Sequence, residues 1–218
     1  MRSTLVKVAV AMWMLGAGAV SVAAQDATPM PLTAESCTVD PVDPKTYIAE
    51  AMAATPAPNT PARVEGKPAD EATVAAVTET MRQSIACTNA GDIGRLLTLT
   101  DPSYAPILLS IAPGQLPAVV EAAAAGSARP VSIATPYTDA SGTPLPLTSL
   151  VSVENVMMDI VDLPDGYYNG QVVATVTIGR PGIGVVTATV YLLEHNGQYR
   201  ITNYYYGNTT PAEATPAA

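Results

Sequence analysis

The first regular pattern along the chain is helical and lies between about residues 70 and 90. Its apolar positions recur at steps of three, four and four, as on one stripe of an α-helix, and they are Val74, Val77, Met81 and Ile85. Asp70 suits the N-cap, because its carboxylate can accept hydrogen bonds from the amides of the first turn. Gly91 supplies the stop, since glycine tolerates the left-handed backbone that ends helices. The pattern therefore predicts one long amphipathic helix.

Shorter helical segments surround it. We expect them at residues 43–52, 93–97, 104–111 and 116–125. Asp92 can cap the second segment, and Pro113-Gly114 separates the last two.

The second half of the chain changes to a period of two. Four long strands are expected, at Leu150 to Leu163, Tyr168 to Ile178, Val185 to Glu194 and Tyr199 to Tyr206. The connections between them are short, and the last is the hairpin signal Asn196-Gly197, so neighbouring strands must be antiparallel. One face of the second strand is apolar (Val172, Ala174, Val176, Ile178) and the other is mixed (Val173, Thr175, Thr177). This favours an α+β fold, with N-terminal helices packed in a curved antiparallel sheet of about four long strands.

Two segments lack any apolar period. Residues 53–69, rich in Pro and Ala, read as a semi-extended linker, and residues 208–218 as a disordered tail. We therefore expect an N-terminal strap and linker over residues 25–69 and one domain over residues 70–207.

The N-terminus has the pattern of a secretory signal peptide. Arg2 and Lys7 are followed by 13 uncharged residues, Val8 to Val20, and then by small residues up to Ala24. Cleavage is expected after Ala24, which would give a secreted or extracytoplasmic protein with no membrane segment. An uncleaved anchor is the alternative, although the apolar run is shorter than the roughly 20 residues that span a bilayer.

Charge narrows the classes of partner. The chain has 10 basic and 19 acidic residues, and removal of residues 1–24 would leave 8 basic residues and a net charge of −11. An acidic surface repels phosphate backbones and anionic lipids, which argues against nucleic-acid and membrane-surface partners.

The chain has two cysteines, Cys37 and Cys87. In an exported protein a disulfide is the expected state, fastening the N-terminal strap to the long helix. The alternative is a thiol nucleophile at Cys87, but no base lies near it in sequence.

Other reactive groupings are sparse. The single histidine, His195, stands beside the Asn196-Gly197 turn, where we expect it to be exposed at the end of the sheet. Asp159, Asp162 and Asp165 are spaced by three residues, so in a strand their carboxylates diverge, and we expect no metal site. No cofactor motif is present in the sequence, and no cofactor is expected.

Three short motifs carry a resemblance to a known family. "ACTNAGD" at the end of the long helix, "RLLTLTDPSY" after it and "NGQYRI" in the last strand resemble the nuclear transport factor 2-like superfamily. The branch with SnoaL-like polyketide cyclases and ketosteroid isomerases is the most similar, and Tyr199-Arg200-Ile201 matches its aromatic-x-Ile motif. The resemblance covers residues 70–207. It implies a cystatin-like cone with a pocket at its open end and a structural role for residues 87–101.

Enzymes of that family use an Asp or a His–Asp pair, often with Tyr, in the pocket. By this resemblance Asp101 is a weak catalytic candidate, and Tyr104 would lie at the mouth of the cone. The favoured alternative for Asp101 is that it caps the helix after Pro102. Side chains alternate along a strand, so Ile201, Asn203 and Tyr205 would share the pocket face.

Two functions remain open from the sequence. The first is a non-catalytic exported domain that binds a small apolar ligand or a protein partner. The alternative is a cyclase or isomerase that uses Asp101 with Tyr104, Asn203 or Tyr205. We also expect that the mixed sheet face could pair in a homodimer.

Overall fold

The computed structural model describes residues 32–55, 65–126, 148–161, 163, 167–180 and 183–207. The expected signal peptide, most of the linker, the C-terminal tail, Asp162 and Asp165 lie outside the described residues.

The helices precede the four long strands in the chain, and this segregation is typical of an α+β fold. The helical elements are η1 (Ala34–Ser36), α1 (Pro44–Ala53), α2 (Glu71–Ala90), α3 (Ile93–Thr98), α4 (Ala105–Leu108), η2 (Pro113–Gln115) and α5 (Leu116–Ala124). The strands are β1 (Glu65–Pro68), β2 (Ser149–Val161), β3 (Val172–Arg180), β4 (Gly184–His195) and β5 (Gln198–Tyr206). Within the described ranges, none of these helices has the length and apolar character needed to cross a membrane.

The sheet has five antiparallel strands in the order β1-β2-β3-β4-β5, and the four long strands are those expected. The expected count of four was wrong, because the end of the supposed linker forms β1 and pairs with β2. Glu65–Pro68 is held in the sheet by backbone pairing with β2, and most of its residues are exposed. Its side chains therefore show no alternation of apolar and polar positions.

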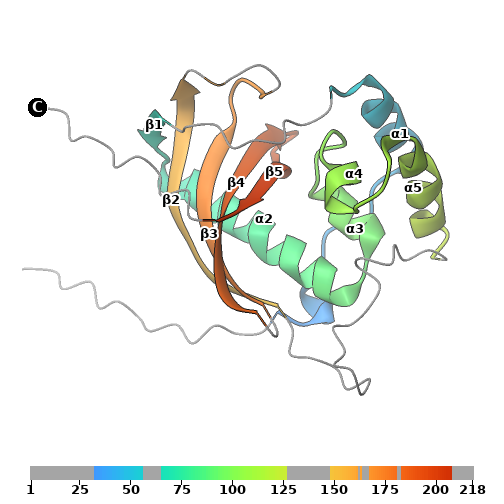
Figure 1. Cartoon of the computed structure of the whole chain (residues 1–218), viewed down its shortest axis with the longest axis horizontal. Helices are drawn as coiled ribbons and strands as arrows, with labels where there is room; N and C mark the ends of the chain where they lie inside the picture. The colour runs from blue at the N-terminus through green and yellow to red at the C-terminus, as the bar shows by residue number, and fades with distance from the viewer. Residues whose placement is uncertain are drawn as a thin grey trace, which may run out of the picture.

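Helix α2 lies across one face of the sheet, and the long strands curve around it (Figure 1). Asp70 caps its first turn by accepting a hydrogen bond from the Thr73 amide, and Gly91 ends it with a left-handed backbone at φ 66°. The buried side chains of α2 pack on the apolar face of the strands, with Met81 and Val77 among the most deeply buried. This contact forms the main core.

A second core lies beyond the β5 edge of the sheet, where α1, α3, α4 and α5 meet (Figure 1). Its centre is Tyr47 of α1, which is 0% exposed and donates a hydrogen bond from its hydroxyl to the Thr100 carbonyl at 3.0 Å. The ring and the hydroxyl of Tyr47 thus both help to fix α1 to the rest of the domain.

The disulfide joins Cys37 to Cys87, as predicted. Both cysteines are buried in the main core, and Gln83 one turn earlier on α2 accepts a hydrogen bond from the Thr38 amide at 2.8 Å. The segment before α1 is thus fastened to the long helix by a covalent bond and by adjacent polar contacts.

Strand β5 contains a β-bulge. Tyr191 of β4 pairs with Asn203, whereas the next residue, Leu192, pairs with Ile201, so Thr202 is an extra residue on β5. Thr202 is buried, and its hydroxyl donates to the Tyr191 carbonyl at 3.1 Å and accepts from the Gln171 side-chain amide at 2.6 Å. Beyond an extra residue of this kind, each side chain of the strand points to the face opposite to the one that strict alternation would give it.

The outer edge of β5 is partly covered by the segment between α3 and α4. Ile201 donates its amide to the Leu99 carbonyl at 2.8 Å, and the Asp101 amide donates to the Ile201 carbonyl at 2.9 Å. A single parallel bridge therefore ties this segment to the middle of the edge strand.

Candidate functional site

A cavity with a largely apolar lining lies between α2, α4 and the inner face of β3 and β5. Its volume is about 480 Å³, within the usual range for sites that bind small molecules. The apolar side chains that line it are Met81, Ile85, Leu96, Ile107, Leu108, Ile178 and Ile201. The hydroxyl-bearing residues Ser84, Thr88, Ser110 and Thr148 complete the walls together with three tyrosines and one arginine.

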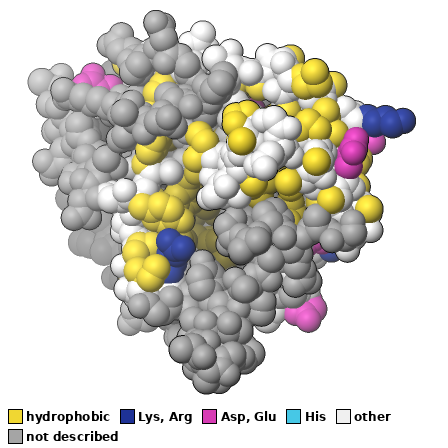
Figure 2. Space-filling view, turned by 45° about the vertical axis from the view of Figure 1, so that its right-hand side comes forward, with side chains coloured by type: hydrophobic (Ala, Val, Ile, Leu, Met, Phe, Trp, Pro, Cys, Tyr) yellow, Lys and Arg dark blue, Asp and Glu magenta, His cyan; other side chains and the backbone are white. Residues whose placement is uncertain are grey.

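The three tyrosines and the arginine gather at one end of this cavity. Tyr104 comes from the turn before α4, Tyr204 and Tyr206 come from the end of β5, and Arg180 comes from the end of β3. The Arg180 guanidinium lies over the Tyr206 ring, 5.2 Å from its centre, in a cation–π contact. Figure 2 shows a recessed band of hydrophobic side chains at the centre of one face, with a basic side chain beside it.

Burial keeps two of these tyrosines protonated. Burial raises the pKa of Tyr104, and neighbouring Tyr206 raises it further. Burial also raises the pKa of Tyr204, with smaller contributions from Tyr206 and Tyr104, against which Arg180 acts to lower it. Since a phenol has a pKa near 10 even in water, these hydroxyls are neutral at physiological pH. They can exchange hydrogen bonds with a ligand but cannot act as bases.

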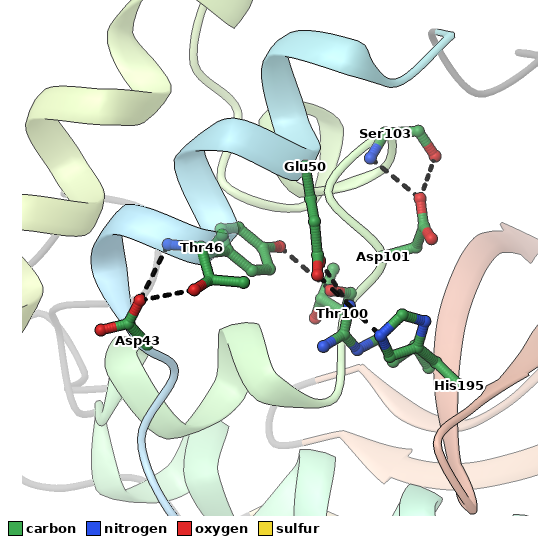
Figure 3. A network of polar contacts seen from close by, with 9 residues as sticks. Asp43, Thr46, Glu50, Thr100, Asp101, Ser103 and His195 are labelled. Atoms are coloured by element: carbon green, nitrogen blue, oxygen red, sulfur yellow. Dashed lines mark hydrogen bonds and ion pairs between the residues drawn. The ribbon is translucent and has the colours of Figure 1, made fainter.

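Among the described residues that line the cavity there is no carboxylate and no histidine. Asp101 does not line it. The Asp101 carboxylate accepts hydrogen bonds from the amide and the hydroxyl of Ser103, at 2.9 and 2.5 Å, and so holds the turn that leads into α4. Figure 3 shows this carboxylate pointing toward Ser103.

One tyrosine does lie beside Asp101. Burial raises the pKa of Tyr168, a hydrogen bond with Ser103 lowers it, and the charge and hydrogen bond of Asp101 raise it. Asp101, Ser103 and Tyr168 therefore form a small polar cluster next to the edge of β5, and none of them lines the cavity.

His195 lies at the end of the sheet, as expected, and its side chain is 42% exposed. Its Nε2 is 3.9 Å from Glu50 of α1, and the same carboxylate accepts a hydrogen bond from Arg200 at 2.7 Å (Figure 3). This network ties α1 to β4 and β5. It does not border the cavity.

The expectation that Ile201, Asn203 and Tyr205 share one face was wrong. Ile201 lines the cavity, but the bulge at Thr202 turns Asn203 and Tyr205 to the opposite face of the sheet. There the Tyr205 ring packs against Tyr191, with ring centres 5.7 Å apart, and its hydroxyl lies 3.1 Å from the Tyr167 hydroxyl. Tyr205 is therefore part of a separate apolar cluster on the outer face of the sheet.

This outer cluster also bears on the sheet face expected to form a homodimer. Val173 is buried in it, beneath side chains that include Leu163 and Tyr167. Thr175 and Thr177 continue the same face and are partly exposed. The homodimer stays a prediction.

Comparison with known proteins adds no assignment. No protein-family model, curated protein or solved structure matches this chain. The resemblance to the nuclear transport factor 2-like superfamily therefore remains a prediction from the three motifs.

Sequence reasoning found Tyr104 and Ile201 but missed Arg180, Tyr204 and Tyr206. A signal for Arg180 was present, because it continues the alternation of Ala174, Val176 and Ile178 on the inner face. The sequence contains no comparable signal for Tyr204 and Tyr206, since strict alternation from Ile201 places both on the face opposite to the cavity.

Metal ligands do not converge in the described part of the chain. Across those residues, no three His, Cys, Asp or Glu side chains gather at one point. Asp159 is engaged with Lys67 of β1, 3.3 Å from its ammonium group.

Proposed function

We propose that this chain is an exported, non-catalytic domain of the nuclear transport factor 2-like type that binds a small apolar ligand in the cavity between α2 and the sheet. The observation that carries the proposal is the lining: a space of about 480 Å³ walled by seven aliphatic side chains together with tyrosine, serine and threonine hydroxyls. Pockets for small molecules combine these two ingredients, because apolar walls supply affinity and a few polar groups fix orientation.

Two further observations support the proposal. The described lining has no carboxylate or histidine to move a proton near neutral pH, and its buried tyrosines hold their protons. The Cys37–Cys87 disulfide fits an oxidising compartment, which agrees with the signal-peptide pattern.

The alternative cyclase or isomerase receives less support from the geometry. It relies on Asp101, whose carboxylate is occupied by Ser103 and is not on the lining. Conversion of a bound compound by the wild-type protein, abolished in Asp101→Asn, would favour that alternative.

Titration with N-phenyl-1-naphthylamine, a neutral dye that fluoresces in apolar surroundings, tests the proposal. We expect saturable binding that Ser84→Phe weakens at least about tenfold, because the new ring would fill the space beside Ser84 on α2. Ala75→Phe adds the same ring at an exposed position of the same helix and should leave affinity unchanged. Absence of saturable binding, or equal binding by both variants, would contradict the proposal.

A further inference from the structure

The cavity has one charged group on its described lining. Arg180 is the only Lys, Arg, Asp or Glu among those residues, although the whole chain has a net charge of −9. At physiological ionic strength surface charges are screened over about 8 Å, so the charge nearest to a bound group dominates its interaction. Among the described lining residues, the only charge close to a bound group is therefore a cation, opposite in sign to the net charge of the chain.

The lining of the cavity ranges from buried to exposed side chains. Met81, Leu96 and Ile201 are almost completely buried, with at most 3% exposure, and we call this part the closed end. Tyr206 is 58% exposed and Arg180 in contact with it is partly exposed, and we call this part the open end; the lining residue Ile107 is also 44% exposed. A ligand that follows this gradient has an apolar body at the closed end and a polar group at the open end.

The position of Arg180 suits it to bind such a polar group. Its guanidinium contacts the Tyr206 ring, which orients the flat group at the mouth of the cavity. Arg180 has further contacts of its own, but a guanidinium carries five N–H donors in its plane, so it can add donation to a ligand while its face stays stacked on the ring. Two parallel N–H bonds from one edge of a guanidinium match the two oxygens of a carboxylate.

Hydroxyl groups near the same end can complete the recognition. Tyr104 and Tyr204 are both on the lining and both keep their protons. The Tyr104 hydroxyl donates to the Tyr204 carbonyl at the long distance of 3.5 Å, and the Tyr204 hydroxyl has a hydrogen bond with Tyr206, so each would exchange its present partner for an anionic oxygen. The open end thus combines a cation with neutral donors and offers no described carboxylate to repel an anion.

We propose that the ligand of this cavity is a hydrophobic carboxylate: an apolar body that fills the closed end and an anionic head group that Arg180 binds at the open end. The inference rests on the proposed function and specifies its ligand class. It also accounts for Tyr206, a large aromatic side chain left exposed at the end of β5, as the support for Arg180.

Three probes with the same ten-carbon chain separate the head group from the chain: decanoate, 1-decanol and decyltrimethylammonium. Each would compete with N-phenyl-1-naphthylamine at pH 7.5 in the full-length protein. We expect decanoate to bind about tenfold more tightly than 1-decanol, the scale of one charge-assisted hydrogen bond, and the cationic probe to bind most weakly.

Two substitutions locate the preference. Arg180→Gln should bring decanoate to the affinity of 1-decanol, whereas Arg180→Lys should keep part of the preference because it keeps the charge. Arg82→Gln removes an arginine from an exposed part of α2, outside the cavity, and should keep all of it. Unchanged dye binding and far-UV circular dichroism would show that the variants are folded.

The outcomes distinguish the two proposals. If all three probes compete equally, if the cationic probe binds best, or if Arg180→Gln leaves the preference intact, the carboxylate inference is wrong while an apolar cavity stands. Loss of the preference in Arg82→Gln to the same extent would also overturn it, because the effect would then come from general charge. If neither the dye nor any probe binds, both proposals fail.

Discussion

The bulge in β5 decides which tyrosines reach the cavity, and Thr202 is the residue that holds it. We predict that Thr202→Val destabilises the protein by about 2 kcal/mol. The substitution removes the hydroxyl that donates to the Tyr191 carbonyl and accepts from the Gln171 amide, at 3.1 and 2.6 Å. Gln171 is 1% exposed, so its amide would be left buried without this acceptor, which costs about 1–3 kcal/mol.

The measurement is urea unfolding followed by far-UV circular dichroism. A loss of about 2 kcal/mol raises the unfolded-to-folded ratio by a factor of about 30, which moves the transition clearly. Thr177→Val is the matched control, because its hydroxyl makes only a long, exposed contact of 3.4 Å with Thr187 and should change stability by less than about 0.5 kcal/mol.

A double substitution separates the hydrogen bond from a general effect of packing. Gln171→Met combined with Thr202→Val replaces both partners by apolar groups, and such a replacement can be nearly neutral. We therefore expect the double variant to be more stable than Thr202→Val alone by about 1 kcal/mol or more. If Thr202→Val behaves like the Thr177 control, or if the double variant loses as much as the two single variants together, the reasoning is refuted.

Three further predictions follow from the same structure. Replacing both Cys37 and Cys87 by Ala should lower the free energy of unfolding, measured in urea, by about 4 kcal/mol, because the disulfide joins residues 50 positions apart. A loss smaller than about 1 kcal/mol would contradict this reasoning. The pKa of Asp70 is lowered mainly by the backbone amide that it caps, so its contribution is present above the unfolded-state pKa and is lost as pH falls below about 4. Asp70→Ala should accordingly be less stable than wild type in thermal unfolding at pH 6, and the gap should close toward pH 2. Gly66→Ala would put a methyl group 2.7 Å from a backbone carbonyl oxygen of β2 and should lower the melting temperature, whereas Gly114→Ala meets open space and should not.

The sequence predicted most of the fold because its signals were local. The stripe of α2 with its Asp70 cap, and the Asn196-Gly197 hairpin, each lie within a few residues and each agree with the structure. Strand β1 was missed because it pairs through its backbone with a strand about ninety positions later in the chain, and its own side chains show no pattern typical of a strand.

The site was less predictable than the fold for a similar reason. Tyr104 and Ile201 were found by position along their elements, and both line the cavity. Asn203 and Tyr205 were misplaced because the rule of alternation holds only until an extra residue intervenes. Thr202 acts as that residue through contacts with Gln171 and Tyr191, which are close in space and distant in sequence.

The backbone bridge on β5 has a consequence for the behaviour of many copies together. A sheet with an open edge can recruit a strand from a neighbouring molecule and grow without limit. Here the segment around Thr100 occupies the middle of β5, so an incoming strand would find an interrupted ladder. The opposite edge, β1, is four residues long and carries Lys67 and Pro68, two residue types that discourage strand addition. Strand addition by a second copy of the chain is thus hindered at the middle of β5 and along β1.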